Sequence, residues 1–360
     1  MIKLYIPQCD GKTIIDPLRS VLGHTETQAN IFGEPDIWKD YVLPAEVVTN
    51  PAWSDYICVP HTWAAILHEH DYIAHIAQVA REHSKRVIIF VIGDTNEHVF
   101  FPAGVSVIVI RSSQYRDRLL PYEVIMPAYA HDLRKISTLY AGMEQQYATQ
   151  EATKATVSFC GWAQASGIKT KISSLVKDVL WSTLGLFIKH LAARRPGIVL
   201  RKNGIDVLKK SNEVIAKIIM RPTYTGSIKT LQGEPRSLRA EYIANMDSCT
   251  YAFAPKGDGN FSVRFFEALS LGKIPVVLDT QIVFPFENVI QYDDFVIKVS
   301  LENIDRIDTE IAEWHRIKGV SGVRDAQIKA RAAFDQYLNI RVFCTYVFTR
   351  EFLEQIPRTV

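Results

Sequence analysis

Residues 253–279 read FAPKGDGNFSVRFFEALSLGKIPVVLD, with an apolar run at each end and a helical pattern between them. The first run ends at Pro255, and the second opens at Ile274. Gly257 and Gly259 let the backbone turn tightly and approach a ligand without a Cβ in the way. A strand, a helix and a second strand in this order predict a βαβ unit, whose first turn is a common place for a phosphate group.

The side chains around these glycines suit a nucleoside diphosphate. Ser262 is expected to cap the helix that follows, and Arg264 lies in its first turn, where the helix dipole favours an anion. Lys256 adds a positive charge, and Asn260 lies in the same turn. Glu267 follows Arg264 by three residues, and a carboxylate there can accept hydrogen bonds from two ribose hydroxyls. The alternative is an ordinary turn in which Arg264 and Glu267 form a surface ion pair, worth roughly a few tenths of a kcal/mol.

The spacing of the glycines disfavours two common nucleotide loops. A dinucleotide loop needs a third glycine after Gly259, but residues 260–262 read Asn-Phe-Ser. A Walker A loop needs Gly-Lys-Ser/Thr at a fixed distance, which is also missing from this stretch. An epimerase or dehydrogenase would need a dinucleotide loop after the first strand, where residues 4–13 (LYIPQCDGKT) offer only Gly11.

Apolar strands alternate with helical patterns along the chain. Continuous apolar strands in this arrangement indicate parallel sheets covered by helices on both faces. Helices are predicted over 63–82, 169–195 and 205–219, and from residue 301 onward with Ser300 as N-cap. Strands are predicted at YICVP (56–60), RVIIFVIG (86–93), VSVIVI (105–110), EVIMP (123–127), VSFCG (157–161), GIVLR (197–201), YAFAP (251–255), IPVVL (274–278) and FVIKV (295–299).

A polar stretch at 143–156 divides these elements into two series. At 360 residues, the chain is also longer than one ordinary core supports. We therefore predict an α/β protein with two Rossmann-like domains, over residues 1–150 and 151–325. Closing helices over 326–360 are expected to pack back on the N-terminal domain.

Residues 239–299 carry a family resemblance. They contain a Tyr…Met…Ser…Phe…Pro-x-Gly series, then Ser-x-Arg…Glu-Ala-Leu…Gly-x-Ile-Pro-Val-Val-Leu, and later Pro-Phe. In this order the elements resemble the signature region of exostosin-like glycosyltransferases. Lys273 stands where that family usually has cysteine, and residues 1–50 carry no resemblance.

The resemblance implies a GT-B glycosyltransferase, with two Rossmann-like domains facing each other across a cleft. The C-terminal domain would bind a UDP-sugar, and the cleft would bind a glycan or a lipid-linked saccharide as acceptor. The reaction would be an inverting transfer. Related enzymes tend to carry an arginine near residues 167–175, and Lys169 and Lys171 are the candidates for its role.

Glycosyl transfer also needs a group that takes the proton of the acceptor hydroxyl. Parallel sheets place ligands at the carboxyl ends of their strands, and His61, Asp94 and His131 follow such ends in the N-terminal series. Asp94 is the first candidate and His61 the second. The alternative for Asp94 is a helix or turn cap, and for the histidines it is packing or solvation.

No metal or other cofactor is expected, because the cations named above can stabilise a diphosphate leaving group themselves. Asp293-Asp294 precedes a predicted strand and is interpreted as structural. His68-Glu69-His70 lacks the spacing of a helical zinc site and is interpreted as a solvated helix face.

Charge is distributed unevenly along the chain. The formal net charge of +2 gives no reason to expect nucleic acid, but residues 161–240 hold fifteen Lys or Arg against four Asp or Glu. Such asymmetry indicates an anionic partner, either a phosphorylated ligand or an acidic membrane surface, unless it is a solvated basic face. The apolar and basic helix over 175–195 could lie on a membrane that holds a lipid-linked acceptor, although core packing is the simpler interpretation.

The five cysteines are scattered and lack CxxC spacing, which favours a reducing compartment. The N-terminus reads too short and too polar for a signal peptide, so we expect a cytoplasmic protein, for which contact at the membrane periphery is left open. The predicted function is a UDP-sugar-dependent glycosyltransferase. The alternative is a glycan-binding or scaffolding protein that keeps the GT-B fold without activity.

Overall fold

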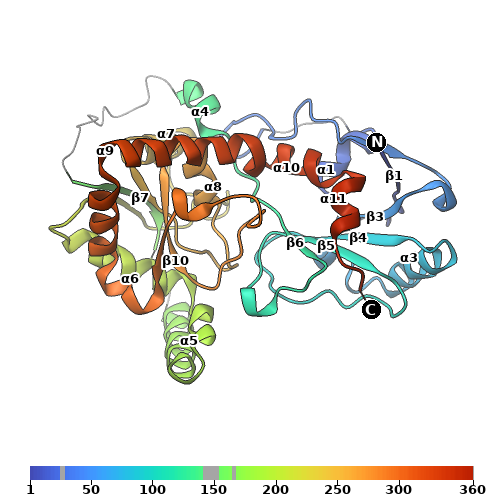
Figure 1. Cartoon of the computed structure of the whole chain (residues 1–360), viewed down its shortest axis with the longest axis horizontal. Helices are drawn as coiled ribbons and strands as arrows, with labels where there is room; N and C mark the ends of the chain where they lie inside the picture. Colours follow the sequence, from blue (N-terminus) through green and yellow to red (C-terminus); the bar gives the residue numbers. More distant parts are fainter. Residues whose placement is uncertain (25–28, 141–153, 164–167, 360) are drawn as a thin grey trace.

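The computed structural model describes residues 1–24, 29–140, 154–163 and 168–359. Most of the predicted 143–156 connection lies outside these residues. The described strands form two separate sheets, and every strand pair within them is parallel. The two predicted Rossmann-like domains are therefore confirmed as the architecture, with one sheet in each half of the molecule (Figure 1).

The N-terminal sheet has the strand order β2-β1-β3-β4-β5-β6. Its strands are β1 (Ile2–Tyr5), β2 (Ala45–Val47), β3 (Tyr56–Thr62), β4 (Arg86–Val91), β5 (Val107–Arg111) and β6 (Glu123–Ile125). The predicted helix over 63–82 is divided into α2 (Trp63–Ile66) and α3 (His70–Glu82), because Glu69 leaves the helical conformation. The carboxyl ends of β4 and β5 carry the loops that reach the C-terminal half.

The C-terminal sheet has the order β11-β10-β9-β7-β8. Its strands are β7 (Thr156–Trp162), β8 (Ile215–Arg221), β9 (Tyr251–Phe253), β10 (Ile274–Asp279) and β11 (Ile297–Ser300). The βαβ unit predicted from residues 253–279 is confirmed, with α8 (Val263–Ser270) between β9 and β10. Helix α7 (Pro235–Asp247) precedes β9.

The segment between β7 and β9 differs from the prediction. GIVLR is not a strand but the first turn of α6 (Gly197–Lys210), and part of the predicted 205–219 helix is β8. Leu200, Ile205 and Leu208 are buried at helical spacing. A short apolar run fits a buried helix as well as a strand, and here the helical pattern continues beyond it.

Helix α5 (Ile168–Phe187) also differs from its simpler interpretation. It is not a core helix: it projects from the C-terminal half, and apolar side chains on one of its faces are exposed (Figure 1). A short 3-10 turn, η5 (Lys189–Arg194), leads back from it to α6.

The closing helices connect the two halves. A 3-10 turn (Leu301–Arg306), whose N-cap Ser300 accepts a hydrogen bond from the amide of Glu302 as predicted, leads into α9 (Ile307–Ala333). The chain then forms α10 (Ile340–Val347) and α11 (Arg350–Gln355) over the N-terminal sheet (Figure 1). Buried Arg86 at the start of β4 donates to the carbonyls of Leu353, Ile356 and Pro357.

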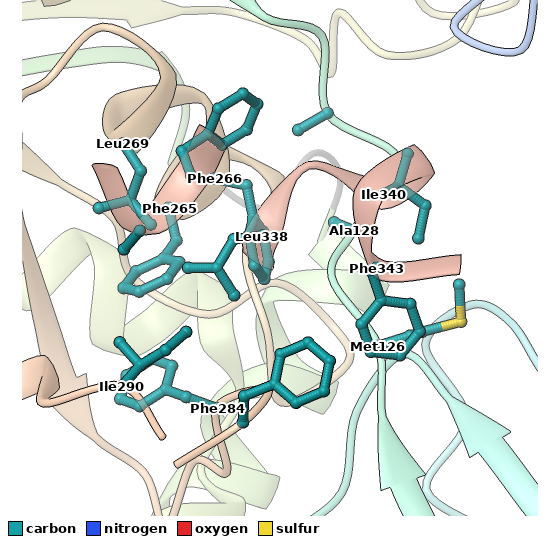
Figure 2. Close-up of a cluster of buried hydrophobic side chains, with 14 of the residues drawn as sticks. Met126, Ala128, Phe265, Phe266, Leu269, Phe284, Ile290, Leu338, Ile340 and Phe343 are labelled. Carbon is teal, nitrogen blue, oxygen red and sulfur yellow. The ribbon is translucent and has the colours of Figure 1, made fainter. Parts of the chain in front are cut away.

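A cluster of buried apolar side chains fixes α8 (Figure 2). The ring of Phe265 stacks on Phe284 at a centroid distance of 4.9 Å. The same cluster contains Leu338 from the closing segment and Met126 from the end of β6. Burying each large side chain contributes roughly 1.5–3 kcal/mol. The helix that begins the predicted phosphate site is therefore held from the N-terminal half, the C-terminal half and the closing helices together.

Candidate active site

The loop over 256–262 and the start of α8 lie at the carboxyl edge of the C-terminal sheet. Ser262 occupies the N-cap position with extended backbone, but its hydroxyl makes no capping hydrogen bond. The predicted position is therefore confirmed, and the predicted capping bond is wrong. Because the side chain does not cover them, the first amides of α8 can serve as donors to an anion at the positive end of the helix dipole.

Two arginines from different elements meet beside this loop. Arg264 of α8 donates through Nη2 to the carbonyl of Cys160 at 2.8 Å, and its guanidinium lies 4.4 Å from the ring centre of Phe159. Arg201 of α6 donates through Nη1 to the carbonyl of Trp162 at 2.6 Å. The Nε atoms of both arginines are buried and have no hydrogen-bond partner. Both guanidinium groups therefore keep donor capacity that the protein does not use.

Burial and the neighbouring charge of Arg264 lower the pKa of Arg201 to about 10. Arg201 was not among the predicted site residues, because GIVLR was interpreted as a strand. The signal that could have identified it is the helical spacing of Leu200, Ile205 and Leu208. This spacing places Arg201 on a helix, from which it reaches the loop after β9.

Lys256 is the third cation and is buried. Its Nζ donates to the hydroxyl of Tyr115 at 3.0 Å and to the carbonyl of Ala193 at 2.7 Å. Burial lowers its pKa to about 7, and the opposing attraction of the Asp258 carboxylate does not offset this desolvation. Arg201 also donates to the carbonyl of Lys256 at 3.3 Å, so these cations form one group, which we call the cation cluster: Lys256, Arg201 and Arg264.

The loop after β9 is clamped to the N-terminal half. The amide of Gly259 donates to Oδ1 of Asp94 at 3.0 Å, and a Cβ on Gly259 would lie 2.9 Å from the Cα of Asp94. Asn260 is buried, and its amide donates to the carbonyls of Gln114 at 3.2 Å and Thr280 at 3.0 Å. Asn260 thus has a visible structural role in holding the loop.

Gly257 lies where α6 approaches this loop. Its amide donates to the carbonyl of Phe261 at 2.9 Å, closing the turn. A Cβ on Gly197, at the start of α6, would clash with the carbonyl oxygen of Gly257. Glycine at position 197 is therefore required for α6 to bring Arg201 beside the loop.

Glu267 does not pair with Arg264, so the proposed surface ion pair is wrong. Its carboxylate is buried, with Oε1 2.8 Å from Nη1 of Arg239 and Oε2 accepting from the hydroxyl of Tyr242 at 2.6 Å. Nε of Arg239 contacts Oε1 of Glu34 at 2.7 Å, from the N-terminal half. Burial is the largest single effect on Glu34 and opposes its ionisation, but the charge and hydrogen bond of Arg239, with His131 and Asn30, together lower the pKa of Glu34. Contact of Glu267 with a ribose stays a prediction.

The candidates for the base differ in their surroundings. His61 is buried, its Nε2 accepts from the amide of Cys9 at 3.0 Å, and its Nδ1 lies 2.9 Å from the carbonyl of Thr13. These partners fix the neutral tautomer with the proton on Nδ1 and occupy both nitrogens, which is the packing role weighed against catalysis. Burial lowers the pKa of His131, whose Nε2 lies 3.4 Å from Oε2 of Glu34.

Asp94 is exposed and lies directly against the glycine loop. Of the three candidates, Asp94 is the one that accepts a hydrogen bond from the loop over 256–262. Its assignment as base stays a prediction.

Two lysines on the segment after β7 were predicted to bind the donor. The side chain of Lys169 lies outside the described residues, and Lys171 is exposed on α5. Within the described part of the chain, no group of three or more His, Cys, Asp or Glu residues could hold a metal ion. Glu69 of the HEH motif instead pairs with Lys12 at 2.5 Å. Metal independence stays a prediction.

Comparison with known proteins agrees with the resemblance. The family model described as the Exostosin GT47 domain matches residues 104–313, more than half of the chain. A probable glucuronosyltransferase of Oryza sativa subsp. japonica is 28% identical over 113 residues, which are 28% of this chain and 26% of that protein. A second one is 33% identical over 73 residues, 20% of this chain and 17% of that protein. The matched regions thus span about a quarter or less of these relatives.

Two solved glycosyltransferase structures are similar over most of their length. WaaG, a glycosyltransferase involved in lipopolysaccharide biosynthesis, is 11% identical with a TM-score of 0.35. The match covers 97% of this chain and 100% of the WaaG chain. A glycosyltransferase from Rickettsia africae is 11% identical with a TM-score of 0.35, covering 98% and 97%. The two parallel sheets themselves, rather than these likenesses, define the GT-B architecture of this chain.

Proposed function

The chain belongs to the exostosin GT47 family of glycosyltransferases, and from this premise we propose that it transfers a sugar from a UDP-sugar to a saccharide hydroxyl with inversion. The observation that carries the proposal is the cation cluster beside the open N-terminus of α8. Three buried or half-buried cations hydrogen-bond to carbonyl and hydroxyl oxygens rather than to carboxylates. The charge of the Asp258 carboxylate acts on both Arg201 and Lys256, and their pKa values are still lowered. Burying more positive charge than the protein balances is unfavourable, so such a cluster is expected where an anionic ligand completes it.

A diphosphate leaving group has the matching chemistry. When the bond between the anomeric carbon and the diphosphate oxygen breaks, negative charge increases on that oxygen. Fixed donors aimed at this charge stabilise the transition state, and the cluster with the first amides of α8 supplies them without a metal ion. The acceptor oxygen forms the new bond to the anomeric carbon from the opposite face, which inverts the configuration.

Asp94 is the proposed base, and its carboxylate takes the proton that the acceptor hydroxyl loses. Its bond from Gly259 keeps the carboxylate against the donor loop. Glu267 is the proposed ribose contact, and one of its oxygens would exchange the hydroxyl of Tyr242 for a ribose hydroxyl. The acceptor is proposed to be a glycan or a lipid-linked saccharide held in the N-terminal half.

Titration of UDP by calorimetry tests the cation cluster. Arg201→Met and Arg264→Met are each expected to weaken UDP binding by at least about tenfold, since a bond to a charged group contributes roughly 1.5–3 kcal/mol. Arg316→Met is the matched control, because Arg316 is exposed on α9 with a weak contact to Glu313. UDP affinity that is unchanged in both cluster variants contradicts the proposal.

Turnover tests the enzyme against the glycan-binding alternative. A panel of nucleotide sugars is offered without acceptor, and slow hydrolysis of one UDP-sugar identifies the donor. A wild-type protein that binds glycans but neither binds UDP nor hydrolyses any donor supports the non-catalytic alternative instead.

A further inference from the structure

Helix α5 presents an apolar stripe to solvent. Its members share one face of the helix and are each at least 49% exposed: Ile172, Leu175, Val176, Val179, Leu180, Leu186 and Phe187. Contiguous apolar surface of this kind is rare on a protein that has no partner there. In Figure 1 the helix projects away from the C-terminal sheet at the lower edge of the molecule.

The opposite face of α5 is the one that packs on the protein. Asp178 is half-buried and pairs with Nε of Arg195 at 2.7 Å, and the ring of Trp181 lies 5.8 Å from the guanidinium of Arg194. An ordinary amphipathic helix turns its apolar face inward. This one keeps Asp178 and Trp181 against the protein and leaves its apolar stripe outward, which indicates that the partner of the stripe lies outside the chain.

We propose that the α5 stripe docks on a membrane that contains anionic phospholipids. Residues 168–190 carry four lysines and one acidic residue, Asp178, whose carboxylate forms an ion pair with Arg195. Lys171 and Lys177 are exposed beside the stripe. A helix with an apolar face flanked by lysines lies in the plane of a lipid interface, with its cations at the headgroups.

A second copy of this chain fits the same surface less well. A symmetric pair formed through the stripes would bring two lysine-bearing helices together, and their like charges would repel one another. An anionic lipid surface is complementary to the same charges. Within the described residues, no helix is both long enough and apolar enough to cross a bilayer, so the inferred contact is peripheral.

Docking through α5 has a consequence for the active site. The η5 turn that follows α5 carries Ala193, whose carbonyl accepts the bond from Lys256 of the cation cluster at 2.7 Å. The membrane-bound helix therefore leads directly into the wall of the donor site. If the proposed function holds, this arrangement favours a lipid-linked saccharide as acceptor, while the docking itself does not depend on that function.

Co-sedimentation with vesicles tests the docking. We expect the wild type to bind vesicles of phosphatidylcholine with phosphatidylglycerol, and to bind phosphatidylcholine alone at least about tenfold more weakly. Lys171→Gln with Lys177→Gln is expected to weaken binding to the anionic vesicles about twenty-fivefold, from about fivefold for each lysine. Val176→Glu with Phe187→Ser is expected to abolish it.

The matched control is Val320→Glu, at an 88% exposed apolar position on α9 far along the chain. This control should bind vesicles as the wild type does, and all variants should keep the wild-type melting temperature because the changed side chains are exposed. Equal binding by the wild type and the Val176→Glu/Phe187→Ser variant overturns the proposal. A wild type that ignores vesicles but forms a dimer that this variant dissociates overturns it in favour of a second copy. UDP titration of the same samples is read separately, so a failure of the proposed function is distinguished from a failure of docking.

Discussion

Replacing Lys256 by methionine tests whether the buried ammonium is kept for function rather than for stability. Methionine has a similar length and keeps the apolar stem, but it removes the charge. Burial lowers the pKa of Lys256 from 10.5 to about 7. At about 1.36 kcal/mol per pH unit, that difference corresponds to about 5 kcal/mol of unfavourable charge burial below pH 7.

Removing the charge relieves this cost in the variant, but lost hydrogen bonds offset part of the gain in stability. The hydroxyl oxygen of Tyr115 and the carbonyl of Ala193 lose their donor, which costs roughly 1–3 kcal/mol. We therefore expect Lys256→Met to raise the free energy of unfolding by roughly 2–4 kcal/mol below pH 7. UDP affinity should fall by about tenfold or more, since the variant lacks one cation of the cluster.

The pH dependence provides the sharper measurement. Because the folded pKa of Lys256 is lowered, the unfolded wild type binds more protons than the folded wild type between pH 7 and 10.5. The wild type therefore gains stability as the pH rises through this window, and the variant lacks that gain. The stability advantage of the variant should shrink by about 2 kcal/mol between about pH 7 and about pH 9.

Urea unfolding of both proteins across this pH range measures the difference, and calorimetry at one pH measures UDP binding. A variant that is less stable than the wild type below pH 7, or a stability difference that does not change with pH, refutes the reasoning about the buried charge. A more stable variant that binds UDP as tightly as the wild type refutes the functional role of Lys256.

Three further variants probe the surrounding contacts. Glu34→Ala removes one carboxylate from Arg239, and loss of one partner of a buried ion pair should lower the free energy of unfolding by about 3–5 kcal/mol in urea titrations, whereas no change contradicts the pairing. Gly197→Ala places a Cβ against the carbonyl of Gly257, so it should reduce both the melting temperature and UDP affinity, and normal binding would count against the close approach of α6. Asp94→Asn should keep the fold and UDP binding but reduce kcat by about 10²–10⁴-fold, and unchanged kcat removes Asp94 as the base.

The sheets could be predicted from the sequence because strands buried on both faces appear as continuous apolar runs. The runs at β3, β4 and β10 are of this kind, with every residue or nearly every residue buried. GIVLR could not be assigned in the same way, since four uncharged residues followed by an arginine fit the first turn of a buried helix equally well. The decision there depends on the turns that follow, not on the run itself.

The candidate site could be located from local sequence, but its contacts could not. Residues 256–264 place the glycines, Lys256 and Arg264 together because they are neighbours along the chain. The partner of Glu267 is Arg239, and the partner of Arg239 is Glu34, which is 205 residues away. Side chains so distant in sequence meet only through the packing of two domains, and no local pattern predicts which of them will be buried together. Local sequence also does not show whether the hydroxyl of Ser262 caps α8, because that depends on how the surrounding elements pack.

The contrast between two sets of arginines explains why the cation cluster, and not the nearby buried network, is assigned to the ligand. Arg239 is buried between the carboxylates of Glu34 and Glu267, so the protein supplies all the negative charge that it needs. Arg201 and Arg264 each have a buried guanidinium nitrogen without a hydrogen-bond partner, and burial lowers the pKa of Lys256 to about 7. Arg264 and Glu267 are three residues apart on α8, yet in the described part of the chain the carboxylates paired with Arg239 have no counterpart at Arg264. Among the described residues, two carboxylates lie against Arg239, but none is in hydrogen-bond contact with the cation cluster beside the N-terminus of α8. The positive charge of the cluster is therefore assigned to an anionic ligand.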